Sequence, residues 1–325
     1  MVKAPLTQMA VTVFEYNREK PARGLCVVRQ AEVPPVLAGH VLVNVLWRPI
    51  NPSDIMCLQG IYQGFRPTKL PAVPGLEGMG VIAAVGEGVS GWKEGTRVTA
   101  APWTYAEQGY GTWQEYTQVR AEHLVAVPAE VGDHQAAQFL VNPMTAYGFL
   151  EDLQVPADEW LLHNGASSVL GRELLCMARR RGTKLINVVR RHEAVDELKA
   201  LGADEVICST DEPVAQKGGA LYLYSLMGGE VVEVPGSDVL FRAVVLHGWW
   251  LNVWLASLSP QQLRAALQPL YTVGTRTQAV MGMLADGTVR PPPPRKVYHL
   301  DEAGAAVEDA QQKSAGGMGK VMLSS

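Results

Sequence analysis

The strongest constraint on the fold is an alternation of strand and helix patterns between Trp160 and Cys208. Three apolar runs typical of strands are separated by two helical patterns, and Gly202 stands where the second helix should end. Because parallel strands need long crossover connections, usually helices, this alternation predicts a parallel, doubly wound sheet. The predicted elements are strands 160–163, 184–189 and 205–208 and helices 169–181 and 192–201, with further strands at 220–226 and 244–249.

A different pattern precedes this region. Short apolar runs broken by Gly and Pro follow one another from Val41 to Val127, which is typical of a compact, largely antiparallel β domain. A helix is predicted over Asp133–Leu150. The run Pro291–Pro294 fits neither a helix nor a central strand, so it marks a return from the sheet domain. A strand at 296–300, a helix at 301–312 and a strand at 319–323 are then predicted to rejoin the β domain.

Composition excludes several classes of function. The 325 residues suit two domains, and a net charge of −4 supplies no general positive field for nucleic acid. No stretch approaches the roughly 20 apolar residues of a membrane span, so no membrane partner is predicted. A cytoplasmic protein is expected, with import into an organelle left open. The seven histidines form neither H-x-H nor H-E-x-x-H, and no metal site is predicted.

The segment Leu161–Gly171 reads LLHNGASSVLG: an apolar strand, a loop of small residues, and the start of a helix. Small side chains there let backbone N–H groups and the helix dipole approach a pyrophosphate. The match to G-x-G-x-x-G is imperfect, because Ala166 and Ser168 stand at the first two glycine positions and only Gly171 is kept. A plain turn between strand and helix, without a ligand, is the alternative.

The residues that follow the second strand favour one dinucleotide. An NAD site places Asp or Glu there to bind the ribose hydroxyls, whereas an NADP site places Arg to meet the 2′-phosphate. This strand is followed by Arg190 and Arg191, whose guanidinium groups suit a bidentate, charge-assisted contact with phosphate. A solvated charge pair is the alternative, but loop and arginines together favour NADP(H).

Four motifs resemble the medium-chain dehydrogenase/reductase superfamily: Asn51–Ile55, Pro74–Gly78, Gly86–Val89 and Gly319–Val321. The resemblance implies an α/β fold class, with a GroES-like β domain and a doubly wound (Rossmann) nucleotide-binding domain. It places the GroES-like catalytic domain at 1–130, completed by 288–325, and the Rossmann NADP-binding domain at 131–287. Zinc members have Cys at the position of Asn51 and His at that of Leu76, so the resemblance is to the zinc-free reductase branch.

Within that branch the chain most resembles the mitochondrial-type trans-2-enoyl thioester reductases, and part of the pattern is shared with quinone oxidoreductases. The motifs are Gln59–Tyr62, Gly111–Trp113, Val141–Tyr147, Asn187–Arg190, Tyr224–Met227 and Gly248–Leu251. The resemblance implies NADPH-dependent reduction of the C=C bond of enoyl-CoA or enoyl-carrier-protein thioesters. It makes Tyr62 the proton donor, a role that suits a phenol with a pKa of about 10. A loop tyrosine that only packs its ring is the alternative.

The resemblance also implies a set of cofactor-binding residues. They are Asn142, Ser167, Ser168, Val169, Leu170, Arg190, Arg191, His192, Tyr224, Ser225, Leu226, Met227, Trp249, Trp250, Leu251 and Lys320. Trp249 and Trp250 are equally consistent with an acyl pocket or with core. Relatives usually form homodimers through an edge of the nucleotide-domain sheet, and the apolar run Val244–Trp250 suits such an edge.

One departure from the family concerns Ser209–Gly219, where too few residues stand for the usual crossover and strand. Either a segment of the polypeptide is missing from this sequence, or the protein has lost one βα unit and part of the wall beside the nicotinamide. Two other functions stay open: an NADPH:quinone or alkenal reductase of the same fold, in which Tyr62 is incidental, and a non-catalytic NADPH-binding regulatory protein, which only this shortened segment suggests.

Overall fold

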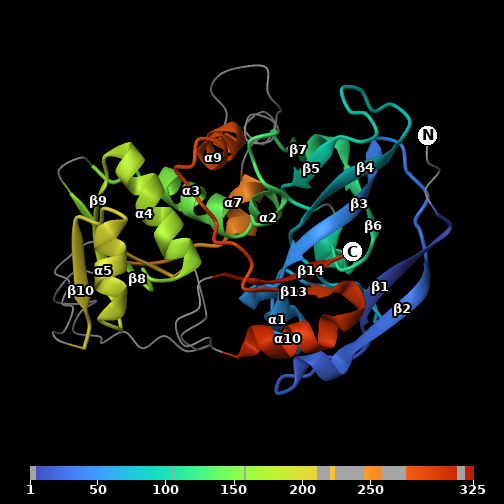
Figure 1. Ribbon diagram of the computed structural model, residues 1–325, viewed down its shortest axis with the longest axis horizontal. Helices are drawn as coiled ribbons and strands as arrows, with labels where there is room; N and C mark the ends of the chain where they lie inside the picture. Colours follow the sequence, from blue (N-terminus) through green and yellow to red (C-terminus); the bar gives the residue numbers. More distant parts are fainter. Residues whose placement is uncertain are drawn as a thin grey trace. The chain divides into compact units, whose positions relative to one another are not determined.

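The computed structural model describes residues 5–103, 105–156, 159–210, 220–223, 245–257, 276–312 and 319–325 (Figure 1). The chain divides into two compact units. Met1–Met144 with Pro260–Ser325 is called the β unit below, and Thr145–Ser259 the α/β unit. The domain limits expected from the sequence, at residues 130 and 287, stay predictions.

The β unit is built around a sheet with the strand order β13-β14-β3-β4-β5-β7, in which β6 also pairs with β3. All its pairs are antiparallel except β13 with β14, so the predicted, largely antiparallel architecture is confirmed. Leu323 of β14 lies opposite Arg48 of β3, so the C-terminal segment contributes to a sheet begun near the N-terminus (Figure 1). The strands are β3 (His40–Pro49), β4 (Met79–Val85), β5 (Arg97–Ala100), β6 (Tyr116–Arg120), β7 (Leu124–Ala126), β13 (Lys296–His299) and β14 (Val321–Ser324).

Two strands and one helix in the N-terminal part of the β unit lie outside the predicted elements. β1 (Thr7–Val13) and β2 (Leu25–Glu32) form an antiparallel pair, and α1 (Pro52–Gln59) follows β3. α1 begins after the N-cap Asn51 with a proline in its first turn, and it ends at Gly60, whose φ of 73° is left-handed. These are ordinary helix-end signals, but eight residues are too few to show a helical period.

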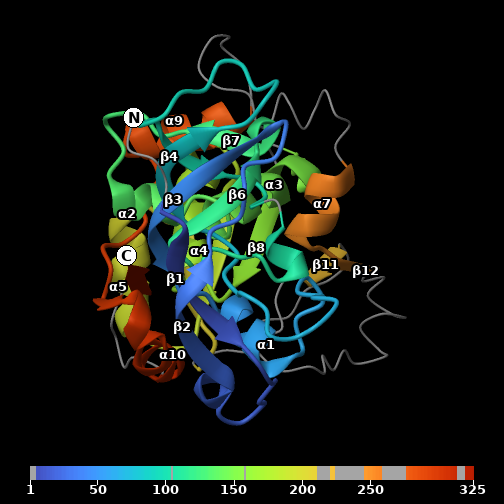
Figure 2. The same cartoon turned by 90° about the vertical axis from the view of Figure 1, so that its right-hand side faces the viewer.

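The core of the β unit joins elements from both ends of the chain. Val11, Leu58 and Leu323 are fully buried in one hydrophobic cluster. Helix α10 (Ala303–Gln311) contributes to the same cluster and lies against β14 and the 3-10 turn η1 (Pro21–Gly24) (Figure 2). The remaining 3-10 turns are η2 (Ala106–Gln108), η3 (Ala121–His123) and η4 (Leu300–Glu302). Burial of this apolar surface is what fixes α1 and the loop that follows it.

The prediction of one helix over Asp133–Leu150 is wrong. The structure has two helices, α2 (Asp133–Ala137) and α3 (Asn142–Leu153), separated by a turn. Pro143 explains the break, because its ring clashes with the preceding turn of a continuous helix and it lacks an N–H to bond there. In the first turn of a new helix the same proline costs little.

The α/β unit contains the parallel strands that the sequence predicts. β8 (Trp160–Asn164), β9 (Lys184–Val189) and β10 (Glu205–Cys208) form a parallel sheet in the order β10-β9-β8. The helices α4 (Val169–Arg181) and α5 (Glu193–Ala200) connect them. This part of the prediction is confirmed nearly to the residue, because each helix carries its own end signals.

A second parallel pair, β11 (Ala220–Leu223) with β12 (Val245–Gly248), is followed by α7 (Leu251–Ser257). The helix α9 (Arg276–Ala285) belongs to the β unit, and neither α7 nor α9 is among the predicted helices. The shortened segment noted in the sequence falls, from residue 211 to 219, outside the described residues. Within the described part of the chain, no helix is long and apolar enough to cross a membrane.

The structure predicts a pH dependence of stability in the α/β unit. Burial lowers the pKa of His163, on β8, to about 4. Below about pH 6.5 the His163 side chain therefore binds more protons in the unfolded state than in the folded one, so the contribution of neutral His163 is lost as the pH falls toward 4. We expect a loss of up to about 3 kcal/mol across this window, and a smaller loss in His163→Gln.

Urea unfolding of both proteins at pH 8, 6 and 5 measures this difference. At pH 8 the imidazole is neutral in both states, so that comparison isolates the change in packing. An identical fall in stability for both proteins between pH 8 and 5 would contradict the prediction.

Candidate active site

The predicted nucleotide loop connects β8 to α4. Ser168 is the N-cap of α4, and its Oγ accepts a hydrogen bond of 3.0 Å from the N–H of Gly171. Gly165 turns the chain with a left-handed φ of 66°. The loop thus leads directly into the positive end of the helix dipole, where an anion is stabilised.

Gly171 is required by the close packing of helix and loop. A Cβ atom at this position would lie 2.5 Å from the carbonyl oxygen and 2.7 Å from the Cα of Ala166. These are backbone atoms, which cannot move aside cheaply. The loop therefore depends on the one glycine of the fingerprint that the sequence keeps, and its binding of a pyrophosphate stays a prediction.

The predicted phosphate-binding residues follow β9. β8 and β9 are parallel neighbours, with Asn164 opposite Val188. Arg190 therefore lies at the same edge of the sheet as the loop between β8 and α4. Arg190, Arg191 and His192 are all exposed there. The structure thus brings the basic residues and the loop together within one unit, as an NADP site requires.

Arg172 is an additional residue at this edge, and it lies outside the predicted set. Its Nε donates to the carbonyl of Ser167 at 3.2 Å, and its guanidinium forms an ion pair with Glu197 of α5. Arg172 thereby links the loop to the next helix. Its only signal in the sequence is a charge in the first turn of α4, which is too common to be informative.

The aromatic residues after β12 have mixed environments. Trp249 is 7% exposed, its Nε1 donates to Asp152 at 3.0 Å, and Phe149 contacts its ring edge to face. These contacts give Trp249 a place in the core of the α/β unit. Trp250 is 36% exposed, and Leu251 begins α7. The predicted residues Tyr224, Ser225, Leu226 and Met227 lie outside the described residues.

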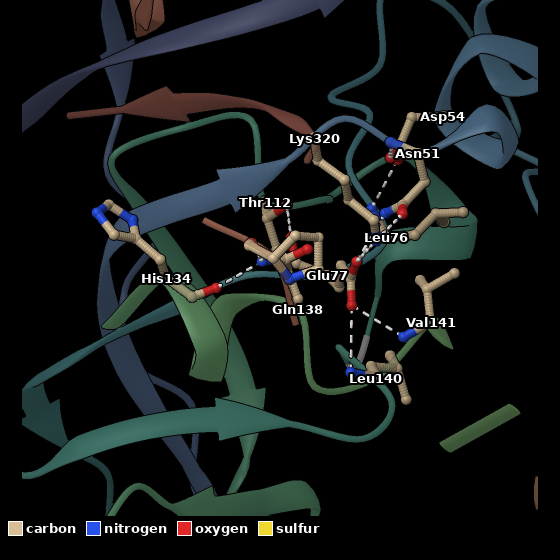
Figure 3. Close-up of polar contacts among 11 residues, drawn as sticks. Asn51, Asp54, Leu76, Glu77, Thr112, His134, Gln138, Leu140, Val141 and Lys320 are labelled. Carbon is tan, nitrogen blue, oxygen red and sulfur yellow. Dashed lines mark hydrogen bonds and ion pairs between the residues drawn. The ribbon is translucent and has the colours of Figure 1, made fainter. Parts of the chain in front are cut away.

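In the β unit, a cluster of buried polar side chains surrounds Glu77 (Figure 3). We call Asn51, Asp54, Glu77 and Lys320 the buried polar cluster. The Glu77 side chain is fully buried, and its Oε1 accepts from Asn51 Nδ2 at 2.8 Å and from Lys320 Nζ at 3.3 Å. Lys320 Nζ also donates to Asn51 Oδ1 at 2.5 Å. Lys320, predicted as a cofactor contact, is thus held by protein groups.

The second carboxyl of the cluster is held by backbone groups. Asp54 accepts from the N–H of Asn51 at 2.8 Å and from the N–H of Leu76 at 3.1 Å. Burial raises the pKa of Asp54 to about 7, although both N–H groups and Lys320 favour the ionised form. The Asn51 bond also caps α1, because Asn51 is the residue that precedes the helix.

The other oxygen of Glu77 binds the turn between α2 and α3. Its Oε2 accepts from the N–H of Val141 at 2.8 Å and from the N–H of Leu140 at 3.1 Å (Figure 3). The next residue is Asn142, the predicted cofactor contact that begins α3. The N–H groups at the start of a helix lack partners within it, and here a carboxylate satisfies them.

Tyr62 follows α1 in the same unit. Its N–H donates to the carbonyl of Met56 at 3.3 Å, and its carbonyl accepts from Phe65 at 3.1 Å. The side chain is partly buried and packs against the hydrophobic cluster of the β unit. The backbone of Tyr62 is therefore anchored to α1, and its ring retains some exposure.

Asp54 and Glu77 lie outside the predicted site. Both occur in motifs that carry the family resemblance, and a carboxyl within a run of small and apolar residues is the signal that could have identified them. Among the described residues, no three His, Cys, Asp or Glu side chains lie where they could share a metal ion.

The loop geometry leads to a test with a matched control. Gly171→Ala places a methyl group against the backbone of Ala166, and we expect it to weaken binding of the predicted NADPH at least ~10-fold. Gly182→Ala, after α4, strains a left-handed φ of 75° but meets no atom within 4 Å, so it should leave affinity unchanged. Fluorescence titration of NADPH measures both affinities, with circular dichroism to verify folding. Equal affinities would contradict the assignment of the loop.

Known proteins resemble the chain over most of its length. Residues 37–129 match the alcohol dehydrogenase GroES-like domain. The mitochondrial enoyl-[acyl-carrier-protein] reductase of Bos taurus is 32% identical over 305 residues, which covers 82% of this chain and 80% of that protein. The human protein of the same name is also 32% identical, over 304 residues, with 82% of this chain and 80% of that protein covered.

A solved structure gives the same relationship at the level of the fold. It is a putative NADPH:quinone reductase from Bacillus thuringiensis, with a TM-score of 0.83, 26% identity, and coverage of 99% of this chain and 100% of that one. The family model matches the β unit, and the identity to the reductases extends well beyond it. The chain therefore belongs to the medium-chain dehydrogenase/reductase superfamily, and within it to the family of the mitochondrial-type enoyl reductases.

Proposed function

We propose that this protein is an NADPH-dependent enoyl reductase that reduces the C=C bond of trans-2-enoyl thioesters, on coenzyme A or on an acyl carrier protein. The observation that carries the proposal is the 32% identity, over 82% of the chain, to a relative named enoyl-[acyl-carrier-protein] reductase. The position of Tyr62, anchored behind α1 with a partly exposed ring, supports the same reaction.

The choice of cofactor rests on residues of the α/β unit. The loop before α4 offers backbone N–H groups and the helix dipole to a pyrophosphate, and Gly171 keeps the approach open. Arg190 and Arg191 are exposed at the same sheet edge, where they suit a 2′-phosphate. When bound, NADPH supplies the hydride for the Cβ of the substrate.

Tyr62 supplies the proton in this proposal. As negative charge develops on the thioester oxygen, the phenol donates a hydrogen bond to it, and the phenol proton then goes to Cα, which leaves a phenolate that takes up a proton from solvent. A phenol suits this role because it stays protonated at neutral pH and donates without carrying a charge.

The proton-donor role predicts a selective loss of activity. We expect Tyr62→Phe to lower kcat/KM for crotonyl-CoA by roughly 10²- to 10⁴-fold, because general acid catalysis is removed while the ring is kept. NADPH affinity should stay unchanged. Tyr110→Phe is the control, because Tyr110 is 62% exposed on the same unit and should retain activity. Stopped-flow oxidation of NADPH at 340 nm measures both variants.

The second candidate function is an NADPH:quinone or alkenal reductase, favoured by the likeness to the Bacillus thuringiensis structure. In that case Tyr62 is incidental, and Tyr62→Phe leaves quinone turnover intact. A panel of crotonyl-CoA, an alkenal and a quinone, each with NADPH and NADH, separates the two. Turnover of quinone alone would refute the thioester proposal, and no turnover of any substrate would favour a regulatory NADPH-binding protein.

We propose further that the protein forms a homodimer through β12. This strand pairs with β11 on one side, and no other strand among the described residues pairs with it. The expected result of size-exclusion chromatography with light scattering is twice the chain mass of 35.2 kDa. A monomer at micromolar concentration would refute it.

A further inference from the structure

We infer that Glu77 is a positioning residue of this enzyme, which fixes Asn142 for cofactor binding without contacting the cofactor itself. The inference rests on the proposed use of NADPH and adds to it a residue outside the predicted site. Its basis is the set of four hydrogen bonds that the Glu77 carboxylate accepts within the β unit (Figure 3).

The first step concerns the turn before α3. The two bonds from the N–H groups of Leu140 and Val141 fix the backbone immediately before Asn142. Pro143 follows at once and has no N–H of its own, so it cannot add a backbone donor to this turn. With the carboxylate removed, the buried N–H of Leu140 and the half-buried N–H of Val141 lose this acceptor, which favours a shift of the turn.

The second step concerns what holds Glu77 itself. Asn51 Nδ2 and Lys320 Nζ bind the opposite oxygen, and Asn51 also stands at the start of α1. The carboxylate is thus fixed from one side by α1 and the segment before β14, while its other side binds the turn. A shift of Glu77 therefore displaces Asn142 relative to Lys320, and both are predicted cofactor contacts.

The third step concerns why only a carboxylate serves. All four groups that reach Glu77 are donors, so both of its oxygens must accept. Glutamine has one oxygen and one NH₂ group. In either orientation, its NH₂ group would face two donors, those of the turn or those of Asn51 and Lys320. Glu77→Gln is therefore a sharp test, because it keeps the size of the side chain and removes only this complementarity.

We expect Glu77→Gln to raise the Kd for NADPH at least ~10-fold, which corresponds to about 1.4 kcal/mol. The control is Glu115→Gln, since Glu115 also accepts a backbone N–H, that of Met9 at 2.6 Å, in the same unit. The control should lower the Tm but leave the Kd within about twofold. An unchanged Kd for Glu77→Gln, or an equal rise for Glu115→Gln, would overturn the inference.

Three further variants complete the experiment. Glu77→Gln should raise the Kd for NADPH in the Lys320→Met variant as well, because the proposed effect acts through Asn142 and not through Lys320. If the double variant has the same Kd as Lys320→Met alone, the assignment to Asn142 is overturned. Asn142→Ala should raise the Kd as well, and an unchanged value would refute the premise. If Glu77→Gln fails to fold, Glu77→Asp keeps the charge with a shorter reach, and wild-type affinity in this variant would overturn the inference.

The readout is direct titration of NADPH into the full-length protein, followed by its fluorescence. No thioester is needed, so failure of the proposed function, seen as absent crotonyl-CoA turnover, is distinguishable from failure of this inference.

Discussion

A buried carboxylate is stable only when it is fully paired, and Glu77 imposes this constraint on the β unit. Its partners come from three regions that are far apart in sequence: Asn51, the turn at Leu140 and Val141, and Lys320. Leaving the charge partly paired would cost several times what a surface ion pair contributes. The start of α1, the turn before α3 and the approach to β14 are therefore linked through one side chain.

Local patterns account for what the sequence predicts well. The alternation from Trp160 to Cys208 gives β8, α4, β9, α5 and β10 with boundaries that differ by at most a residue or two. Each of these elements has its own signals: Ser168 caps α4, and Gly182 ends it in a left-handed conformation. The position of the exposed arginines after β9 could be predicted for the same reason. Residues that follow a parallel strand lie at the edge of the sheet where the strands have their carboxyl ends.

The remaining features depend on contacts that no local pattern reveals. The polar partners of Glu77 lie up to 243 residues away, so its role is invisible in the sequence around Pro74–Gly78. Lys320 could be aligned with a family position, but its bonds to Asn51 and Glu77 emerge only from the fold. The break between α2 and α3 could have been predicted, since Pro143 is a local signal. The apolar residues continue at helical spacing across the turn, however, so the pattern resembles a single helix.

The pairing of β14 with β3 has a consequence for the order in which the chain folds. The side chains of Arg48 and Ser325, which bond at 2.9 Å beside this pairing, are 277 residues apart. A ribosome makes the whole of Thr145–Ser259 between them, so the α/β unit is complete before the β unit has its last strand. Until then, Trp47–Pro49 on β3 is an open strand edge, which is a site where chains pair wrongly. The nascent β unit thus exposes this unpaired edge while the α/β unit is already complete.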